Sequence, residues 1–320
     1  MRPLSALRVP VWVALALPGV LAVGLYANTL GNGFAYDDVG IIERDTTVHS
    51  LRNVPRIFSR PYWPEGYGGA KTGLYRPLTS TAFAAQWTLG NGKPAVFHAV
   101  NTMLHAAVSV LVTLLLLRLG VAPAAAMLGG VTFAAHPVHT EAVANVVGQA
   151  ELLAATFALS ALLVAVGSRP PRLPSVPRLV LAASLDLAAV LSKESAVVLP
   201  ALLVVVDGAQ GRWEPSPRLE SYTAYLRLRG PLFLAWTLAA AAAFVARWLA
   251  IGTPVGRDVP PALIGLADDG TARFFTMIRV WPHYVRLLVA PFELSADYGP
   301  AVLLPATEFT PMGAFGLALA

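Results

Sequence analysis

The chain has 320 residues, of which 56% are hydrophobic and 13% are charged, and its formal net charge is +5. Soluble globular proteins carry about 25% charged residues, and a soluble fold of this length cannot bury so much apolar surface. The absence of cysteine excludes a thiol nucleophile, cysteine-ligated zinc and a disulfide framework. The composition therefore predicts an all-α, polytopic membrane protein.

Seven apolar runs that predict membrane helices follow one another along the chain. They cover residues 11–27, 95–117, 121–135, 142–166, 179–191, 195–206 and 231–251. The first follows Arg2 and Arg8, and it is interpreted as a retained helix because the residues after it make a poor signal-peptide cleavage site. The third, fifth and sixth runs are shorter than the roughly 20 residues that a span needs, so their ends are expected to extend into neighbouring polar residues.

Basic residues indicate how these helices are oriented. With a cytoplasmic N-terminus, the cytoplasmic segments are 1–10, 118–120, 167–178 and 207–230. Arginine outnumbers the acids Asp207, Glu214 and Glu220 in these segments taken together, with Arg2, Arg8, Arg118, Arg169, Arg172, Arg178, Arg212, Arg218, Arg227 and Arg229. This pattern obeys the positive-inside rule, and it explains the net positive charge without a nucleic-acid partner.

Two polar segments, 28–94 and 252–307, are then the large external loops after the first and seventh helices. Within the second loop, polar residues recur every three or four positions over 273–289. An amphipathic helix lying in the membrane interface is favoured there over an eighth span, which would place three arginines at bilayer depth. The chain stops within an apolar run at 312–320, which predicts that these residues are one domain of a longer protein.

Adjacent carboxylates follow the first helix at Asp37 and Asp38. Such a pair can bind a cation or accept a hydroxyl proton, because each carboxylate raises the pKa of the other. The alternative is a solvated turn, since Asp and the nearby Gly residues favour turns.

A second group of polar residues comes after the third apolar run. His136, His139 and Glu141 have a spacing that permits a divalent metal or a phosphate, although a helix end meeting lipid headgroups is an alternative. Glu151 lies within an apolar segment, where an ionisable residue normally faces a cavity or a partner.

Two further groups complete the set of polar residues. His98, Asn101 and His105 share one face of the second helix, either for function or for helix packing. Lys193 and Glu194 lie between two short apolar runs, where the lysine either caps a helix or contacts a phosphate. The expected topology places four of the polar groups on the extracytoplasmic side, at one shared site: those at Asp37-Asp38, at His136–Glu141, at Lys193-Glu194 and at Asp297-Tyr298.

Seven short motifs occur in order along the chain. They are Phe34–Asp38 (FAYDD), Tyr75–Leu78 (YRPL), Phe97–Asn101 (FHAVN) with His105, His136–Val143 (HPVHTEAV), Gly148–Leu153 (GQAELL), Ser192–Glu194 (SKE) and Leu294–Tyr298 (LSADY). Together they resemble the transmembrane and tetratricopeptide-repeat O-mannosyltransferase family, a group of GT-C membrane glycosyltransferases. The resemblance covers about residues 24–300.

The resemblance implies a GT-C helical bundle that transfers a sugar with inversion, from a polyprenyl-phosphate carrier to a hydroxyl acceptor outside the cytoplasm. It implies mannose as the sugar, with a protein or an envelope glycan as the acceptor. Asp37 or Asp38 takes the place of the catalytic acid in the first external loop, and Asp38 is favoured. The donor is expected to contact Lys193, Arg76, His136 and His139, with Glu194, Glu141, Glu151, His98 and Asp297 beside them.

One position departs from the family pattern, because Gly-Arg-Ala-Glu reads Gly148-Gln149-Ala150-Glu151 here. Lys193 is therefore expected to carry more of the phosphate contact, with help from Arg76 and from Arg279 or Arg286. The arginine-rich, lysine-poor composition favours a bacterial inner-membrane protein with an undecaprenyl carrier. A divalent cation stays open as a cofactor, and a silent scaffold acting through C-terminal tetratricopeptide repeats or a lipid-carrier transporter is the alternative function.

Overall fold

The computed structural model describes residues 9–167, 173–211, 219–252, 270–292, 294–295, 306 and 308–319. Helices, and no strands, make up the regular structure of this part of the chain, which confirms the predicted all-α class. The chain divides into two compact units. The first unit comprises residues 1–136 and 142–256, and the second comprises 137–141 and 257–320.

All seven predicted runs are helical in the first unit. Their helices are α1 (Val11–Tyr26), α4 (Pro94–Arg118), α5 (Pro123–Ala135), α7 (Gln149–Val166), α8 (Val176–Ser192), α9 (Leu199–Ala209) and α10 (Leu219–Ile251). Four helical segments among the described residues are long and apolar enough to cross a membrane: Val11–Gly31, Pro94–Arg118, Val146–Val166 and Tyr222–Ile251. α5 is apolar but has only 13 residues, and it does not extend beyond the run predicted at 121–135, because Pro123 begins it and His136 ends it.

The two largest differences from the predicted boundaries are in the fourth and seventh runs. The run 142–166 is broken into α6 (Thr140–Ala144), a short 3-10 turn at Val146–Gly148, and α7. The break arises because side chains from elsewhere in the chain bind the main-chain groups at 143–147. α10 begins 12 residues before the apolar run at 231, since Arg229 in its polar first turns pairs with Asp207 of α9.

Proline marks where several helices begin. Pro94 and Pro123 stand at the first positions of α4 and α5, and Pro77 does so in α3 (Pro77–Gly90). A proline costs little there because the N–H of a first-turn residue has no partner within the helix. α7 ends at Gly167 with φ +57°, where a Cβ atom would collide with the Arg178 guanidinium.

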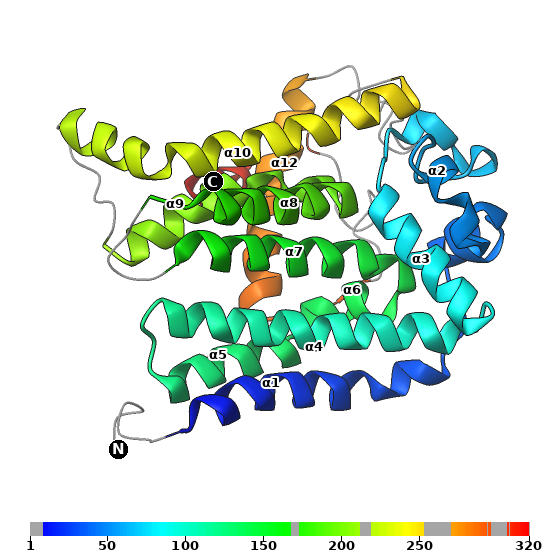
Figure 1. The fold of residues 1–320 in the computed structure, drawn as a ribbon, viewed down its shortest axis with the longest axis horizontal. Helices are drawn as coiled ribbons and strands as arrows, with labels where there is room; N and C mark the ends of the chain where they lie inside the picture. Colours follow the sequence, from blue (N-terminus) through cyan, green and yellow to red (C-terminus); the bar gives the residue numbers. More distant parts are fainter. Residues whose placement is uncertain are drawn as a thin grey trace. The chain divides into compact units, whose positions relative to one another are not determined.

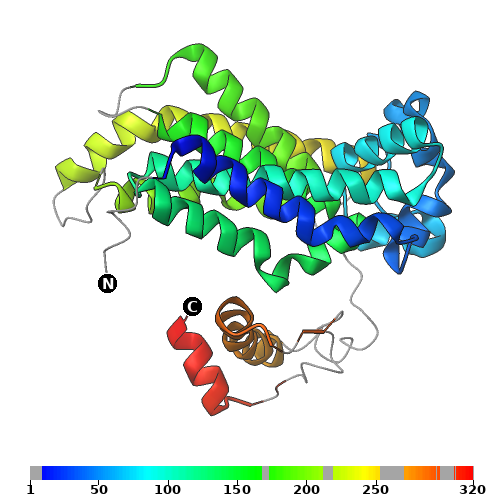
Figure 2. The same ribbon diagram turned by 90° about the horizontal axis from the view of Figure 1, so that it is seen from below.

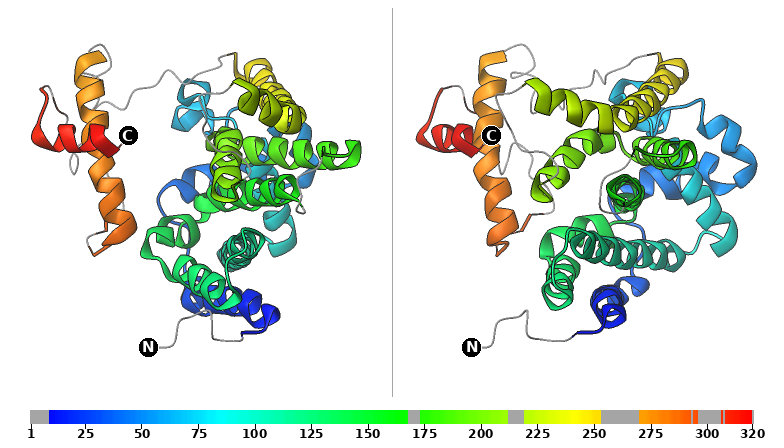
Figure 3. Two further views of the ribbon diagram at one scale, coloured as in Figure 1. Left: turned by 90° about the vertical axis from the view of Figure 1, so that its left-hand side faces the viewer. Right: turned by 60° about the vertical axis from the view of Figure 1, so that its left-hand side comes forward.

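The long helices of the first unit run back and forth along one direction, as Figure 1 shows. The start of α1 and the ends of α4, α7 and α9 lie at one end of this bundle (Figure 1). The segment 28–94, with α2 (Val54–Ile57) and α3, gathers at the opposite end, and the view from below agrees (Figures 1 and 2). Several helices of the bundle appear nearly end-on in Figure 3. Successive long helices therefore run in opposite directions between the two ends of the bundle, as the sequence predicts.

Small residues bring α1, α4 and α5 into close contact. Ala22, Ala106 and Ala134 form one buried cluster from these three helices. A Cβ atom on Gly130 of α5 would lie 2.9 Å from Cγ of Pro18 and closer still to the Thr113 hydroxyl. Close approach of backbones through small residues is a common way to associate membrane helices, where no hydrophobic force acts between them.

The close packing at Gly130 leads us to expect that a larger residue there lowers stability. Gly130→Ala should lower the free energy of unfolding by about 1–3 kcal/mol, because the added methyl group overpacks the contact. Gly24→Ala on α1 is the matched control, since a Cβ atom there meets nothing within 4 Å. Thermal unfolding of both variants in detergent micelles measures the difference. Equal melting temperatures for the two variants would contradict close packing at Gly130.

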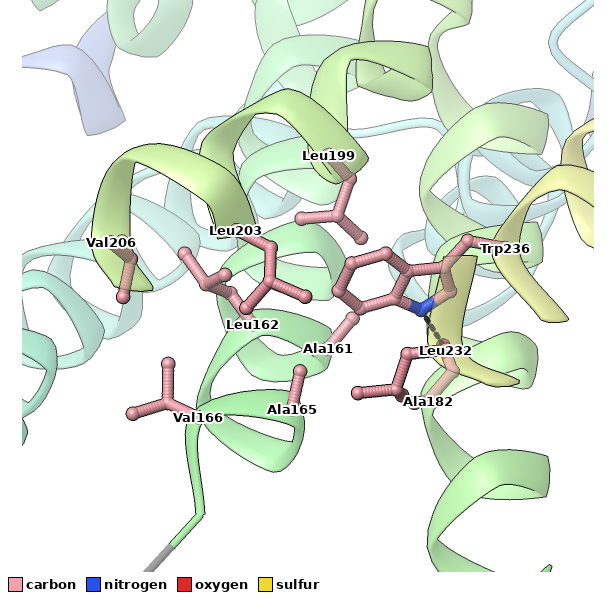
Figure 4. Close-up of a cluster of buried hydrophobic side chains, with 10 residues drawn as sticks. All are labelled: Ala161, Leu162, Ala165, Val166, Ala182, Leu199, Leu203, Val206, Leu232 and Trp236. Carbon is pink, nitrogen blue, oxygen red and sulfur yellow. Dashed lines mark hydrogen bonds between the residues drawn. The ribbon is translucent and has the colours of Figure 1, made fainter. Parts of the chain in front are cut away.

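A larger apolar cluster joins α7, α8, α9 and α10. Trp236 of α10 is buried at its centre and donates a hydrogen bond from Nε1 to the carbonyl of Ala182 in α8, at 3.1 Å. Figure 4 shows its ring among leucine and alanine side chains from the other helices, such as Leu199 and Ala161. This cluster fixes α10 against α8 and so determines where the far end of α10 lies.

The second unit contains α12 (Gly270–Val289) and α13 (Pro311–Leu319). The helix predicted over 273–289 is confirmed, and its position in the membrane interface stays a prediction. Gly313 and Gly316 of α13 contact Ile278 of α12 closely, so that no Cβ atom fits freely at either glycine.

Candidate active site at one end of the bundle

Polar side chains gather at the end of the first unit that holds segment 28–94. We call them the polar cluster, and its members are Asp37, Asp38, Tyr62, Arg76, Glu151, Lys193, Glu194 and Arg247. They come from the loop after α1, the start of α3, the first turn of α7, the junction after α8 and the last turns of α10. Helices of opposite direction thus bring residues together that are up to 210 positions apart.

Asp38 is an anchor between the first loop and the start of α7. Its side chain is 1% exposed, and its carboxylate accepts hydrogen bonds from main-chain N–H groups of Val147 at 2.9 Å, Ala35 at 3.2 Å and Val146 at 3.4 Å. Burial raises the pKa of Asp38, and these three hydrogen bonds oppose that rise because they stabilise the ionised form. The carboxylate thereby takes the place of the main-chain acceptors that these N–H groups of Val146 and Val147 would have in an unbroken helix.

Asp37 has the opposite environment. Its side chain is exposed, none of the hydrogen bonds described for Asp38 reaches it, and burial of part of the group raises its pKa. The preceding Tyr36 has φ +49°, an unusual conformation for a non-glycine residue that is typical of functional loops. The two neighbouring carboxylates therefore differ, because Asp38 is enclosed by the start of α7 and Asp37 is open.

Arg76 connects the first loop with α8. Its guanidinium donates two hydrogen bonds to Glu194, from Nε at 3.0 Å and from Nη2 at 2.7 Å, and it stands 5.1 Å from the ring centroid of Tyr62. Tyr62 interacts electrostatically with Arg76, Asp38 and Asp37, in that order of strength. Burial raises the pKa of Glu194, but the hydrogen bonds and charge of Arg76 outweigh it and keep the pKa below its usual value.

Lys193 forms the second ion pair of the polar cluster. Its ammonium contacts Glu151 in the first turn of α7. Burial and the charge of Arg76 lower the pKa of Lys193 to about 8, while Glu194 opposes them. The hydroxyl of Thr79 in α3 donates to the carbonyl of Ser192 at 2.9 Å, which holds this junction against α3.

The polar face predicted on α4 is buried and serves packing. Asn101 donates from Nδ2 to the carbonyls of Val143, Asn145 and Val146, at 3.1–3.3 Å. His105 contacts the carbonyl of Ala134 at 3.1 Å, and His98 that of Gly33 at 3.3 Å. These side chains satisfy main-chain groups at helix ends and breaks, so the packing alternative is favoured.

The contacts that define the polar cluster do not involve the remaining predicted residues. His136 directly follows α5 as its C-cap, whereas His139 and Glu141 belong to the second unit. Glu141 lines a cavity of about 150 Å³ there, with residues such as Val138 and Leu287. Asp297 lies outside the described residues. Within the described part of the chain, no three His, Asp or Glu side chains converge as a metal centre.

Tyr62 and Arg247 are members of the polar cluster that the sequence analysis did not identify. Arg247 carried a usable signal, because it is an arginine inside the last apolar run and such residues commonly mark functional sites. Tyr62 lies in a segment of mixed polarity, where nothing in the sequence distinguishes it from its neighbours.

Known proteins resemble this chain in sequence. It is 34% identical over 289 residues to the protein O-mannosyl-transferase Tmtc2 of Drosophila melanogaster, which covers 87% of this chain and 30% of that protein. It is 28% identical over 297 residues to a protein O-mannosyl-transferase of Caenorhabditis elegans, covering 87% of this chain and 38% of that protein. The mouse protein O-mannosyl-transferase TMTC3 is 37% identical over 147 residues.

The chain thus spans about a third of the length of the two relatives that cover most of it. No family model matches the chain, and no solved structure matches it. The relatives bear the family name that the seven motifs predict, and two of the matches extend over most of the chain. The chain therefore belongs to the TMTC family, the transmembrane and tetratricopeptide-repeat protein O-mannosyl-transferases.

Proposed function

We propose that this chain is the catalytic membrane domain of a glycosyltransferase that moves mannose from a polyprenyl-phosphate carrier to a protein hydroxyl. The observation that carries the proposal is the polar cluster, where an open carboxylate and two partly exposed ion pairs lie at one end of an apolar bundle. The names of the relatives support mannosyl transfer to protein.

Asp37 is the base in this proposal, and Asp38 is its positioning residue. The acceptor hydroxyl oxygen attacks C1 of the sugar while its proton passes to the Asp37 carboxylate. The bond between C1 and the phosphate oxygen breaks, and its electron pair leaves with the phosphate. One displacement inverts C1, so no protein nucleophile is needed. This assignment reverses the preference for Asp38, whose oxygens are occupied by three N–H donors.

Lys193 and Arg76 stabilise the charge that develops on the leaving phosphate. Both cations are held by carboxylates, Glu151 and Glu194, which fix them before the donor binds. The polyprenyl tail stays in lipid, so its phosphate reaches the protein at the membrane surface. We assign the polar cluster to the extracytoplasmic side, because the arginines at the end of α4, the start of α8 and the early turns of α10 lie at the other end of the bundle. We retain a bacterial inner membrane and an undecaprenyl carrier in the proposal.

The direct test uses the full-length protein, purified and reconstituted with radiolabelled polyprenyl-phosphate-mannose and candidate acceptor proteins. Transfer of label to protein by the wild type, abolished in Asp37→Asn, is the expected result. If the wild type binds the donor but transfers no label to any hydroxyl acceptor, the proposal of transferase activity is wrong and a silent scaffold takes its place.

A substitution at Lys193 separates phosphate binding from helix capping. Lys193→Met keeps the apolar stem and removes the charge, so donor affinity or turnover should fall by about 10–100-fold while the melting temperature changes little. A cap alone contributes at most about 1 kcal/mol to stability. Donor binding and thermal unfolding are measured on one preparation. Unchanged donor affinity and turnover would assign Lys193 to a structural role.

A further inference from the structure

Arg247 lies on the face of α10 that packs against α8. Ala243, one turn earlier on this face, belongs to a buried cluster with Ala189 and Val190 of α8 and with Ala196 just beyond α8. Residues four apart lie on the same side of a helix, so Arg247 continues this face toward the polar cluster. Lys193 is the residue directly after α8, and its main-chain N–H donates to the carbonyl of Ala189 at 2.9 Å. The alanine contacts therefore direct both cations to the same end of the helix pair.

The guanidinium of Arg247 has unused hydrogen-bonding capacity. Its Nε atom is buried without a hydrogen-bond partner, and within the described ranges no carboxylate forms an ion pair with it. A buried N–H group without an acceptor costs about 1–3 kcal/mol. A cation in an apolar helix is normally paired or faces a cavity or a ligand, which makes Arg247 unusual.

The other cations of the polar cluster already have their counter-ions. Arg76 is bound by Glu194 and Lys193 by Glu151, whereas Arg247 interacts with Glu194 by attraction and with Arg76 by repulsion at longer range. An anion entering beside Glu194 would therefore bind the Arg247 guanidinium without displacing a carboxylate from it. Arginine suits a phosphate because its planar fork can donate two parallel hydrogen bonds.

We propose that Arg247 binds the phosphate of the polyprenyl-linked donor, as a binding residue of α10 next to Lys193. This inference rests on the proposed function and adds a third helix to the donor site. The phosphate would supply the acceptors that the guanidinium lacks, and α10 would then be fixed to the site by its ligand. A lipid headgroup carries the same phosphate chemistry, so the experiment distinguishes the two sources.

The test compares Arg247→Gln with wild-type full-length protein in nanodiscs of neutral phosphatidylcholine. The probes are polyprenyl-phosphate-mannose and polyprenyl phosphate without sugar. The variant should weaken the binding of both probes by about 10–100-fold, because both carry the phosphate, with an unchanged melting temperature. Arg247→Lys should restore part of the affinity. Arg227→Gln is the matched control, since Arg227 is an exposed arginine of the same helix at its other end.

Two results would overturn the inference. Unchanged affinity of Arg247→Gln for both probes would exclude a donor contact. A loss of affinity that occurs only in discs containing anionic phosphatidylglycerol would assign Arg247 to lipid headgroups. Neither result touches the proposed function, which fails separately if the wild type binds donor without transferring its sugar.

Discussion

Asp37→Asn should lower the rate of mannosyl transfer by about 10²–10⁴-fold, the usual contribution of a positioned general base. The amide keeps the size and polarity of the side chain but cannot accept the hydroxyl proton. Because Asp37 is exposed and lies outside the hydrogen bonds of the Asp38 anchor, donor affinity and thermal stability should stay near those of the wild type. Single-turnover transfer and donor binding, measured together, test this separation.

Asp38→Asn is the informative neighbour. An amide can replace only part of a carboxylate that accepts three N–H groups, so this variant should lose about 1–3 kcal/mol of stability.

Burial raises the pKa of Asp37, so transfer by the wild type should decline with falling pH at a point above the usual carboxyl value near 4. Asp37→Asn should lack that decline. Near-wild-type turnover in Asp37→Asn would remove this residue from catalysis.

Asp207→Leu should destabilise the bundle by about 3–5 kcal/mol, because it leaves a buried guanidinium without its counter-ion. Asp207 and Arg229 are 0% and 3% exposed, and they share hydrogen bonds of 2.7 Å from Nε and 2.6 Å from Nη2. Tyr225 donates a further hydrogen bond to Asp207 at 3.2 Å. Denaturant titration of the protein in detergent micelles measures the loss.

The double variant Asp207→Leu with Arg229→Met provides the control. Replacing a buried ion pair by apolar side chains is often neutral, so it should recover most of the stability that the single variant loses. Equal stability of the wild type and Asp207→Leu would mean that Arg229 finds another partner. This pair lies at the end of the bundle opposite the polar cluster, so donor binding should change little in either variant.

Apolar runs predicted the helices of the bundle because membrane spans require long stretches of apolar side chains. They did not predict the break at Asn145, where the sequence remains apolar on both sides. The main-chain groups there are bound by Asn101 and Asp38, which are 44 and 107 positions away. Sequence periodicity is local, so contacts over such separations are invisible to it.

The candidate site was also predicted only in part, because motifs identify residues but do not specify how they pack. The motifs identified Asp37, Arg76 and Lys193 one by one, and the alternation of helices predicted that they share one end of the bundle. Which carboxylate is open and which is enclosed depends on how the loop packs against the start of α7, and adjacent identical residues give no signal for it. Although Arg247 stands out as an arginine inside an apolar run, its place beside the polar cluster is set by how α10 packs on α8, which an apolar run does not specify.

The Asp38 carboxylate accepts hydrogen bonds from the main-chain N–H groups of Val146 and Val147, and these hydrogen bonds do not involve the valine side chains. Any residue except proline supplies those donors, but the Val146 side chain is also buried in one apolar cluster with Ile42 and Phe97. The junction between the loop after α1 and the start of α7 therefore has a main-chain part that is independent of side-chain identity and an apolar part that depends on it. A chimaera that carries another relative's loop, with its acidic pair, should engage this α7 when the apolar side chains of that loop also fill the cluster around Val146.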